Sequence, residues 1–279
     1  MKSIRTVIPR FFNFERRFPR LRKTVWKGLY GFLAWRFPTQ EWFFMNYGYA
    51  YANPEEQPEL LPEDEKNSYF IHLYAQTLQP VELAHQDILE VGSGRGGGSE
   101  WIARTQNVKS MTSVDLSSNA ISLCQKNHKL PNLTFKQGDA EKLPFPDHAF
   151  DIVLNIESSH HYPSMPTFLQ EVKRVLKPGG YFCLADYRDL PEVEDFKQHL
   201  DASGLERLQL IDITDNVIKA LDLTNDVKQN MIERQVPRFL LDAFKTFAAV
   251  KDTEVYNRFV DGRLIYLSTL LRKNKEEVE

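Results

Sequence analysis

Short apolar runs and amphipathic stretches alternate through most of the chain. The apolar runs have the length and continuity of strands that are buried on both faces of a sheet. They lie at residues 88–91, 111–114, 133–137, 150–155, 181–185, 208–213 and 264–271. Helix-compatible stretches precede or separate them at residues 66–81, 99–107, 118–128, 166–176 and 193–202. We therefore predict an α/β fold with a doubly wound, seven-stranded, mostly parallel sheet and right-handed crossovers.

Two segments stand outside this alternation. Residues 215–250 have helical periodicity and contain no strand pattern, so they form a predicted helical insertion before the last strand. Such an insertion can cover an active site as a lid, or it can extend the packed domain, and both interpretations are open. Residues 1–64 precede the pattern as a predicted N-terminal helical extension, which leaves residues 65–279 as the main domain.

A glycine-rich turn follows the first predicted strand. Gly92, Gly94 and Gly96 are followed directly by two more glycines. Because glycine has no Cβ and reaches positive φ, the backbone of such a turn can approach a ligand closely. The turn also leads into a helix N-terminus, whose first N–H groups have no intrahelical partner. The stretch predicts a nucleotide-type binding loop, and the residues around it decide which nucleotide it binds.

Three acidic residues at the ends of successive predicted strands favour a cationic adenosyl ligand. Glu90 would repel the pyrophosphate of a dinucleotide but attract a positive centre. Asp115 can accept hydrogen bonds from both hydroxyls of a ribose, and Asp139 lies where a purine amino group can donate. No phosphate-binding lysine follows the glycines, which argues against a Walker-type NTPase. S-adenosyl-L-methionine combines a ribose, an adenine and a positive sulfur, so we predict it as the cofactor.

Composition excludes several classes of protein. The 279 residues are 42% hydrophobic and 26% charged, which is enough to bury a sizeable core. The net charge of −3 argues against a polyanion-binding protein as a whole. Two cysteines, Cys124 and Cys183, exclude a disulfide scaffold and fit a reducing compartment. Because no run suits a transmembrane helix or a secretory signal, we expect a cytoplasmic location.

Residues 1–38 are strongly basic and aromatic. They hold ten lysines and arginines against a single acid, Glu15, and so carry about +9 while the rest of the chain carries about −12. Basic residues interleaved with Trp and Phe are typical of a helix that lies on a membrane surface. A helix docked on the core with a solvated basic face, or contact with nucleic acid, would have a similar composition. We expect peripheral membrane contact as one interpretation and no nucleic-acid partner; the oligomeric state stays open.

The motifs together resemble those of class I S-adenosylmethionine-dependent methyltransferases. The family's E-x-G-x-G-x-G pattern stands at residues 90–96, and its segments match GDAEKLPFPDHAFDIV at 138–153 and EVKRVLKPGGYF at 171–182. The resemblance implies a Rossmann-like methyltransferase fold. It also implies binding roles: Glu90 and the loop residues for the methionine part, Asp115 with Leu116 for the ribose, Asp139 with Ala140 for the adenine, and Asn155 facing the cofactor. The loop residues in this set are Gly92, Ser93 and Gly94.

A narrower resemblance extends over residues 155–186, with further matches at FFMNYGYA near residue 45 and at CQKNHKLPNLTFKQGDAE. Here the chain is similar to the phthiotriol and phenolphthiotriol dimycocerosate O-methyltransferases of mycobacterial lipid synthesis, and also to sugar and polyketide O-methyltransferases. This resemblance implies methylation of a hydroxyl on a lipid or polyketide. A hydrophobic small molecule or lipid is therefore the expected acceptor.

Methylation of a hydroxyl requires a group that takes its proton, because an alcohol does not ionise at neutral pH. His160 matches the family's histidine and is the predicted base, with His161 as the alternate. Asp186 can accept from the second ring nitrogen and stabilise the imidazolium. Glu157 can bind the cofactor's amine instead of acting as a base. No cluster of acidic residues suggests a metal site, so we expect no metal.

The sequence thus predicts O-methylation of a hydroxyl on a hydrophobic acceptor. Two alternatives are open. The first is C-methylation of a sterol- or quinone-like lipid, for which the aromatic segment 42–51 could surround a cationic intermediate. The second is a protein that binds the cofactor without transferring its methyl group.

Overall fold

The computed structural model describes residues 42–275 of the chain. The basic segment 1–38 lies outside them, so its predicted helix and its membrane contact stay predictions. The strands are β1 (Asp87–Val91), β2 (Ser110–Asp115), β3 (Leu133–Gln137), β4 (Phe150–Ile156), β5 (Leu176–Asp189), β6 (Glu206–Asp212) and β7 (Leu264–Arg272). The helices are α3 (Ser68–Leu78), α4 (Gly97–Thr105), α5 (Ser118–Asn127), α6 (Met165–Val175), α7 (Val193–Asp201), α8 (Thr214–Gln235), α9 (Leu241–Phe247) and α10 (Glu254–Val260).

These strands form one sheet in the order β3-β2-β1-β4-β5-β7-β6. The first five strands pair in parallel, and β7 runs antiparallel between β5 and β6. The prediction of a seven-stranded, mostly parallel sheet is confirmed. Because parallel strands end at one edge, this order brings the carboxyl ends of β1, β2 and β4 together.

Helices cover both faces of the sheet, as the apolar runs require. Ile88 of β1 and Met111 of β2 pack in one cluster with residues of α3, α4, α8 and α10. Their neighbours Leu89 and Val114 pack in a second cluster with α6 and α7. Successive side chains of a strand point to opposite faces, so each run of consecutive apolar residues supplies both cores.

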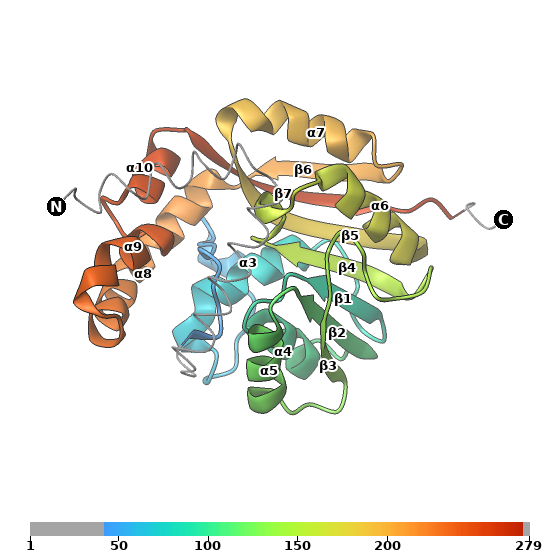
Figure 1. Ribbon diagram of the computed structural model, residues 1–279, viewed down its shortest axis with the longest axis horizontal. Helices are drawn as coiled ribbons and strands as arrows, with labels where there is room; N and C mark the ends of the chain where they lie inside the picture. Colours follow the sequence, from blue (N-terminus) through green and yellow to red (C-terminus); the bar gives the residue numbers. More distant parts are fainter. Residues whose placement is uncertain (1–41, 276–279) are drawn as a thin grey trace.

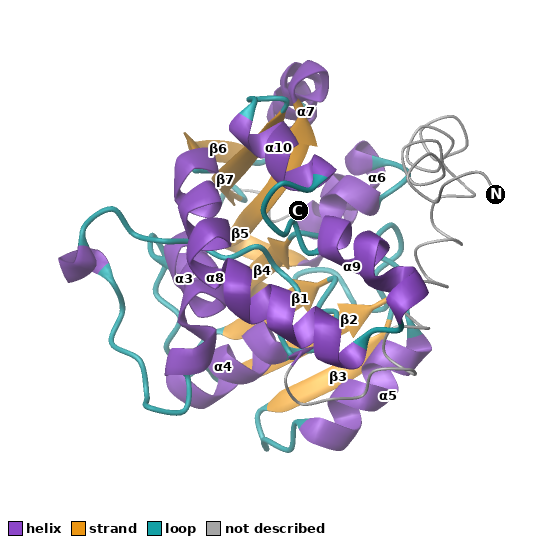
Figure 2. Cartoon of the chain, turned by 90° about the vertical axis from the view of Figure 1, so that its left-hand side faces the viewer, coloured by secondary structure: helices purple, strands orange, loops and turns teal. Residues whose placement is uncertain are grey.

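The stretch before the last strand is helical, as predicted. Figure 1 shows its helices α8, α9 and α10 gathered at one side of the molecule, and Figure 2 looks at that side, where α8 and α9 cross in front of the sheet. Residues 43–51, which precede the main domain by the sequence prediction, also belong to the packed structure, since Tyr47, Ala50 and Tyr51 are buried.

The fifth strand differs from its prediction. It begins at Leu176 and ends at Asp189. The sequence predicts a strand only at residues 181–185, because the proline and glycines at 177–180 are typical of a turn. Its pairing with β4 is irregular, because Phe150 pairs with Leu176 but Ile152 pairs with Tyr181. The Pro-Gly-Gly stretch is therefore an interruption within the strand rather than its boundary.

Candidate active site

The glycine loop between β1 and α4 is fastened to the end of β2. The backbone N–H groups of Gly92 and Ser93 donate to the carbonyl of Val114 at 2.8 and 3.0 Å. Gly92 has a φ of +81°, and a Cβ there would lie 2.2 Å from Ser158 Oγ. Only glycine fits both the backbone angle and this close approach. The loop is thus held in position by its hydrogen bonds to the end of β2 and by its close approach to Ser158.

Asp115, at the end of β2, lies directly beside this loop. Its carboxylate accepts hydrogen bonds from the N–H of Gly94 at 3.0 Å and from the N–H of Ser117 at 2.8 Å. Burial raises the pKa of Asp115 to about 6, although these two hydrogen bonds oppose the rise. The side chain lines both cavities described below. It is the one acid of the predicted set that both cavities share.

A cavity of about 90 Å³ holds the predicted adenine end of the site. Leu116, Asp139 and Ala140 line it together with Asp115. The Asp139 carboxylate accepts from the N–H of Glu141 at 3.1 Å, which fixes its orientation at this rim. The structure therefore brings together the residues predicted to bind ribose and adenine.

Glu90 and Asn155 lie behind the loop instead of in the cavity walls. Glu90 is 1% exposed, and its carboxylate accepts hydrogen bonds from Tyr74, at 2.8 Å, and from Ser99. The Asn155 amide donates to the carbonyl of Val91 at 2.8 Å. Both side chains therefore hydrogen-bond to residues that flank the loop or pack against it, and so support its conformation. Their direct contact with a cofactor stays a prediction.

A larger cavity of about 390 Å³ opens on the other side of Asp115. Its walls combine the glycine loop, the loop after β4, the end of β5 and the helical insertion. Phe43, Phe44 and Met45 give it an apolar side, and Phe247 and Val255 of the α8–α10 region contribute from the opposite side. The insertion thus lines the site. It leaves space for a hydrophobic molecule next to the loop.

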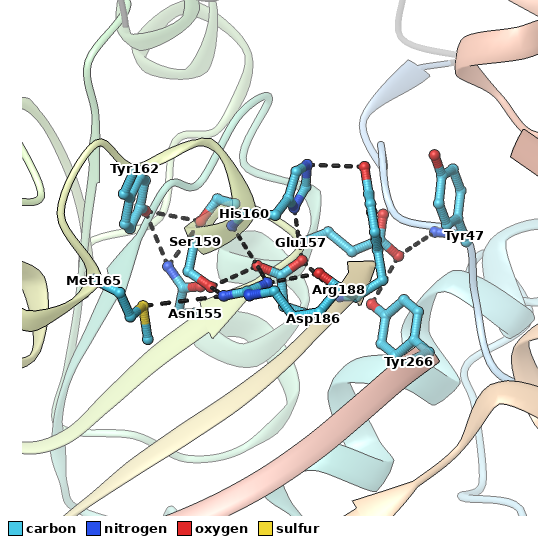
Figure 3. A network of polar contacts seen from close by, with 12 residues as sticks. Tyr47, Asn155, Glu157, Ser159, His160, Tyr162, Met165, Asp186, Arg188 and Tyr266 are labelled. Carbon is cyan, nitrogen blue, oxygen red and sulfur yellow. Dashed lines mark hydrogen bonds and ion pairs between the residues drawn. The ribbon is translucent and has the colours of Figure 1, made fainter. Parts of the chain in front are cut away.

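His160 and Asp186 meet at this cavity, as predicted (Figure 3). The ring Nδ1 lies 2.6 Å from Asp186 Oδ1, and the backbone N–H of His160 donates to Oδ2 at 2.8 Å. Ser159 donates to the same Oδ2 at 2.6 Å, and Arg188 forms an ion pair with it at 3.1 Å. Burial alone would raise the pKa of Asp186, but the charges of His160 and Arg188 and these hydrogen bonds hold it well below its usual range.

This arrangement sets the proton positions on the imidazole. With Nδ1–H donated to the ionised Asp186, the other nitrogen, Nε2, carries the lone pair. Nε2 lies 2.9 Å from the hydroxyl of Tyr187, which can donate to it. His161 lines both cavities, with its ring centroid 3.9 Å from that of His160. Asp186 thus orients the ring of His160, the predicted base, through Nδ1.

Glu157 lies deeper in the same cavity. Its Oε1 accepts from the N–H of Tyr47 at 2.6 Å and from the hydroxyl of Tyr266 at 2.8 Å. Burial raises the pKa of Glu157 to about 8, against these hydrogen bonds and the charge of Lys228. Its backbone has a φ of +45°, an unusual conformation for this residue type. We infer that the surrounding packing imposes it.

Several residues of the site escaped the sequence analysis. Tyr187 and Arg188 belong to the part of β5 that was not predicted as strand, and Asp186 lies within that strand, opposite Leu267 of β7, instead of at its end. A signal was present, because Asp186 and Arg188 are two residues apart and so share one face of an extended strand. Tyr47 is more than a hundred residues from its partner Glu157, and no local pattern links them.

Comparison with known proteins agrees with this geometry. A family profile described as "Methyltransferase domain" matches residues 89–184. The phthiotriol/phenolphthiotriol dimycocerosates methyltransferase of Mycobacterium tuberculosis (strain ATCC 25618 / H37Rv) is 38% identical over 244 residues, which are 88% of this chain and 90% of that protein. This chain belongs to the methyltransferase family.

Two further similarities concern the sequence and the fold of this methyltransferase. The fatty-acid O-methyltransferase of Mycolicibacterium smegmatis (strain ATCC 700084 / mc(2)155) is 37% identical over 81% of this chain and 82% of its own length. The geranyl diphosphate C-methyltransferase of Streptomyces coelicolor A3(2), solved with S-adenosyl-L-homocysteine, has a TM-score of 0.62 at 15% identity, covering 86% of this chain and 95% of its own. The predicted family, fold and cofactor are confirmed.

Two properties of the described residues concern metal ions and membranes. Among residues 42–275, no group of three or more His, Cys, Asp or Glu side chains is placed to hold a metal ion. Within the same residues, no helix combines the length and apolar character needed to cross a bilayer.

Protonation of Asp115 should make cofactor binding depend on pH. A carboxylate that accepts two ribose hydroxyls binds best when ionised, and the pKa of Asp115 in the free protein is about 6. We expect the Kd for S-adenosyl-L-methionine to be constant above about pH 7 and to rise by up to about tenfold per unit as the pH falls below 6. Calorimetry between pH 5 and 8 measures this. Asp115→Asn should bind weakly with a flat profile; a flat profile in the unmodified protein contradicts the role of Asp115.

Proposed function

We propose that this methyltransferase transfers the methyl group of S-adenosyl-L-methionine to a hydroxyl oxygen of a hydrophobic, lipid-like acceptor. One observation carries the proposal: the imidazole of His160, held by the buried Asp186, lines a cavity next to the glycine loop that has an apolar side of Phe43, Phe44 and Met45. The lipid-related relatives support a hydrophobic acceptor.

Some of these residues would bind the cofactor, and others would transfer the proton. The glycine loop, Asp115 and Asp139 would hold the cofactor, which supplies an electrophilic methyl group when bound. His160 Nε2 takes the hydroxyl proton as the bond from oxygen to the methyl carbon forms and the bond from that carbon to sulfur breaks. The ionised Asp186 stabilises the imidazolium that results. Positioning in the cavity brings the hydroxyl close to the methyl group.

Tyr187 enters this scheme because its hydroxyl contacts Nε2 of His160. An acceptor hydroxyl must either take the place of the Tyr187 hydroxyl at Nε2 or pass its proton to Nε2 through that hydroxyl. In both cases the tyrosine keeps Nε2 pointed into the cavity before the acceptor arrives. The tyrosine ring is itself held at a centroid distance of 5.6 Å against the ring of Tyr47.

C-methylation is the second candidate, and the surroundings of Glu157 favour it. Tyr47, Tyr187 and Tyr266 surround that part of the cavity, and aromatic faces stabilise cationic intermediates. However, burial raises the pKa of Glu157 to about 8, which weakens its carboxyl as a counter-charge for a cation. O-methylation is therefore the better supported reaction.

Label transfer from methyl-labelled S-adenosyl-L-methionine to a set of hydroxylated lipids tests the proposal. Each lipid is paired with a control in which the hydroxyl carries a methyl ether. We expect label in the organic extract with free hydroxyls only. Equal label in the ether controls would indicate transfer to carbon, and no transfer at all despite tight cofactor binding would indicate a protein that binds the cofactor without catalysis.

A further inference from the structure

A third cavity, of about 80 Å³, lies behind the aromatic segment that walls the active site. Its walls are mostly apolar side chains from this segment and from α3, α8 and α9. They include Trp42, Phe70, Met231, Ile232 and Phe244. Two cationic residues, Arg95 and Lys228, also line it, and its described lining contains no carboxylate. We call this cavity the rear chamber.

Lys228 is the unusual member of the lining. It lies on the buried face of α8 and is 6% exposed. Within residues 42–275, no group accepts a hydrogen bond from its Nζ. The nitrogen lies 5.4 Å from the ring centroid of Phe70 and 6.0 Å from that of Tyr47. These ring faces attract the ammonium, but they do not replace the three hydrogen bonds that it makes in water.

A buried ammonium without hydrogen-bond acceptors is less stable than one in water, and this lowers its pKa. Burial lowers the pKa of Lys228 to about 8, while the charge of Glu157 opposes the shift. The group therefore still carries its proton at neutral pH. A bound anion would supply the missing acceptor and restore the pKa.

Two further groups give the rear chamber the character of a binding site. Asn46 donates its amide to the carbonyl of Phe70 at 3.3 Å, but its Oδ1 is a second buried atom without a partner in the described part of the chain. Arg95 is 2% exposed, with its guanidinium 5.5 Å from the ring centroid of Trp42. The chamber thus offers an unused ammonium, an unused amide oxygen for a hydroxyl or a water, and a second positive charge. The two positive charges are complementary to a carboxylate, and the amide oxygen can accept from a water beside it.

The rear chamber adjoins the active-site cavity. Phe44, Met45, Asn46 and Tyr47 line both, and Arg95 of the glycine loop lies at both as well. A chain with a reacting hydroxyl beside His160 would have to pass these shared residues to reach the chamber. An acidic group at its far end would lie against Lys228.

We propose that the rear chamber binds the carboxylate of the acceptor, so that the preferred substrate is a hydroxylated fatty acid whose acid group lies remote from the methylated oxygen. The inference rests on the proposed O-methylation for the position of the hydroxyl. The shared chemistry is a carboxylate on Lys228, and the cofactor's own amino-acid carboxylate is the other possible source. The experiment distinguishes the two.

Calorimetry on the protein saturated with S-adenosyl-L-homocysteine compares 12-hydroxydodecanoate with dodecane-1,12-diol, which lacks only the acid group. We expect the acid to bind at least about tenfold more tightly than the diol, because its hydrogen bonds to Lys228 are charge-assisted. Lys228→Met should reduce this ratio to within about twofold and leave the diol's affinity nearly unchanged. Lys228→Arg should keep the preference, and it tests the charge even if the methionine variant does not fold.

Three outcomes would overturn the inference. The first is equal binding of acid and diol by the unmodified protein. The second is a preference that persists in Lys228→Met. The third is a tenfold loss of S-adenosyl-L-homocysteine affinity in Lys228→Met with an unchanged ratio, since it would assign the carboxylate to the cofactor.

Turnover separates this inference from the proposed function. Methyl transfer without a preference for the acid overturns the rear-chamber assignment and leaves O-methylation standing. A preference for the acid without any transfer supports the chamber and counts against the proposed reaction alone. Formation of the methyl ester of 12-hydroxydodecanoate would place the carboxylate at the methyl donor and overturn the assignment.

Discussion

Replacing His160 with alanine should lower kcat by about two to four decades and leave the Kd for S-adenosyl-L-methionine close to that of the unmodified protein. Asp186 holds Nδ1 of the imidazole at 2.6 Å, and Nε2, which lies 2.9 Å from the Tyr187 hydroxyl, is the proposed acceptor of the proton. The substitution leaves in place the glycine loop and Asp115, the residues predicted to bind the cofactor, which line the same cavity. Steady-state kinetics and calorimetry on the same samples measure both quantities.

His161→Ala is the matched control, since this neighbouring histidine lines the same cavity, whereas the hydrogen bond that orients the proposed base joins Asp186 to Nδ1 of His160. We expect it to retain activity within about tenfold. Asp186→Asn should resemble the alanine variant at His160, because an amide no longer stabilises the imidazolium. Full activity of His160→Ala would remove this histidine as the base, and a larger loss in His161→Ala would transfer the role to its neighbour.

Asp115→Ala should abolish cofactor binding at the concentrations used in calorimetry. Two charge-assisted hydrogen bonds to ribose hydroxyls contribute about 1.5–3 kcal/mol each, so their loss weakens binding by about two to four decades. The variant also removes the acceptor for the N–H of Gly94, which lies 3.0 Å away. The loop loses part of its support as a second consequence.

An exposed aspartate provides the control for this variant. Asp195 lies on the surface of α7, far along the chain from the loop, so Asp195→Ala should bind the cofactor normally. Thermal unfolding of both variants separates a loss of binding from a loss of folding. Unchanged affinity in Asp115→Ala would refute the ribose assignment.

The sheet could be predicted from the sequence because its signals are local. Ile88, Leu89 and Val91 form a continuous apolar run, and a strand buried on both faces requires such a run. The signal for the glycine turn is equally local, since three backbone positions with positive φ favour glycine over other residue types. Strand ends then placed Asp115 and Asp139 at one edge without any tertiary information.

The acceptor side of the site could not be predicted in the same way. The aromatic composition of residues 42–51 allowed a place beside the acceptor but did not fix it, because these residues reach the cavity from far upstream in the chain. Lys228 reaches the rear chamber from α8. No spacing rule connects residues so far apart. The length of β5 was also underestimated, because Pro178 and two glycines form a turn signal that the neighbouring strand β4 overrides. Tyr187 was missed for that reason.

The central claim is that His160 accepts the proton of the acceptor's hydroxyl, and a crystal structure of the ternary complex tests it most directly. The complex contains S-adenosyl-L-homocysteine and an alcohol that the enzyme methylates. We expect the hydroxyl oxygen within about 2.6–3.2 Å of His160 Nε2, or joined to it through the Tyr187 hydroxyl, and turned toward the cofactor's sulfur. An oxygen bound to Glu157 instead, with neither His160 nor Tyr187 in contact, would contradict the account.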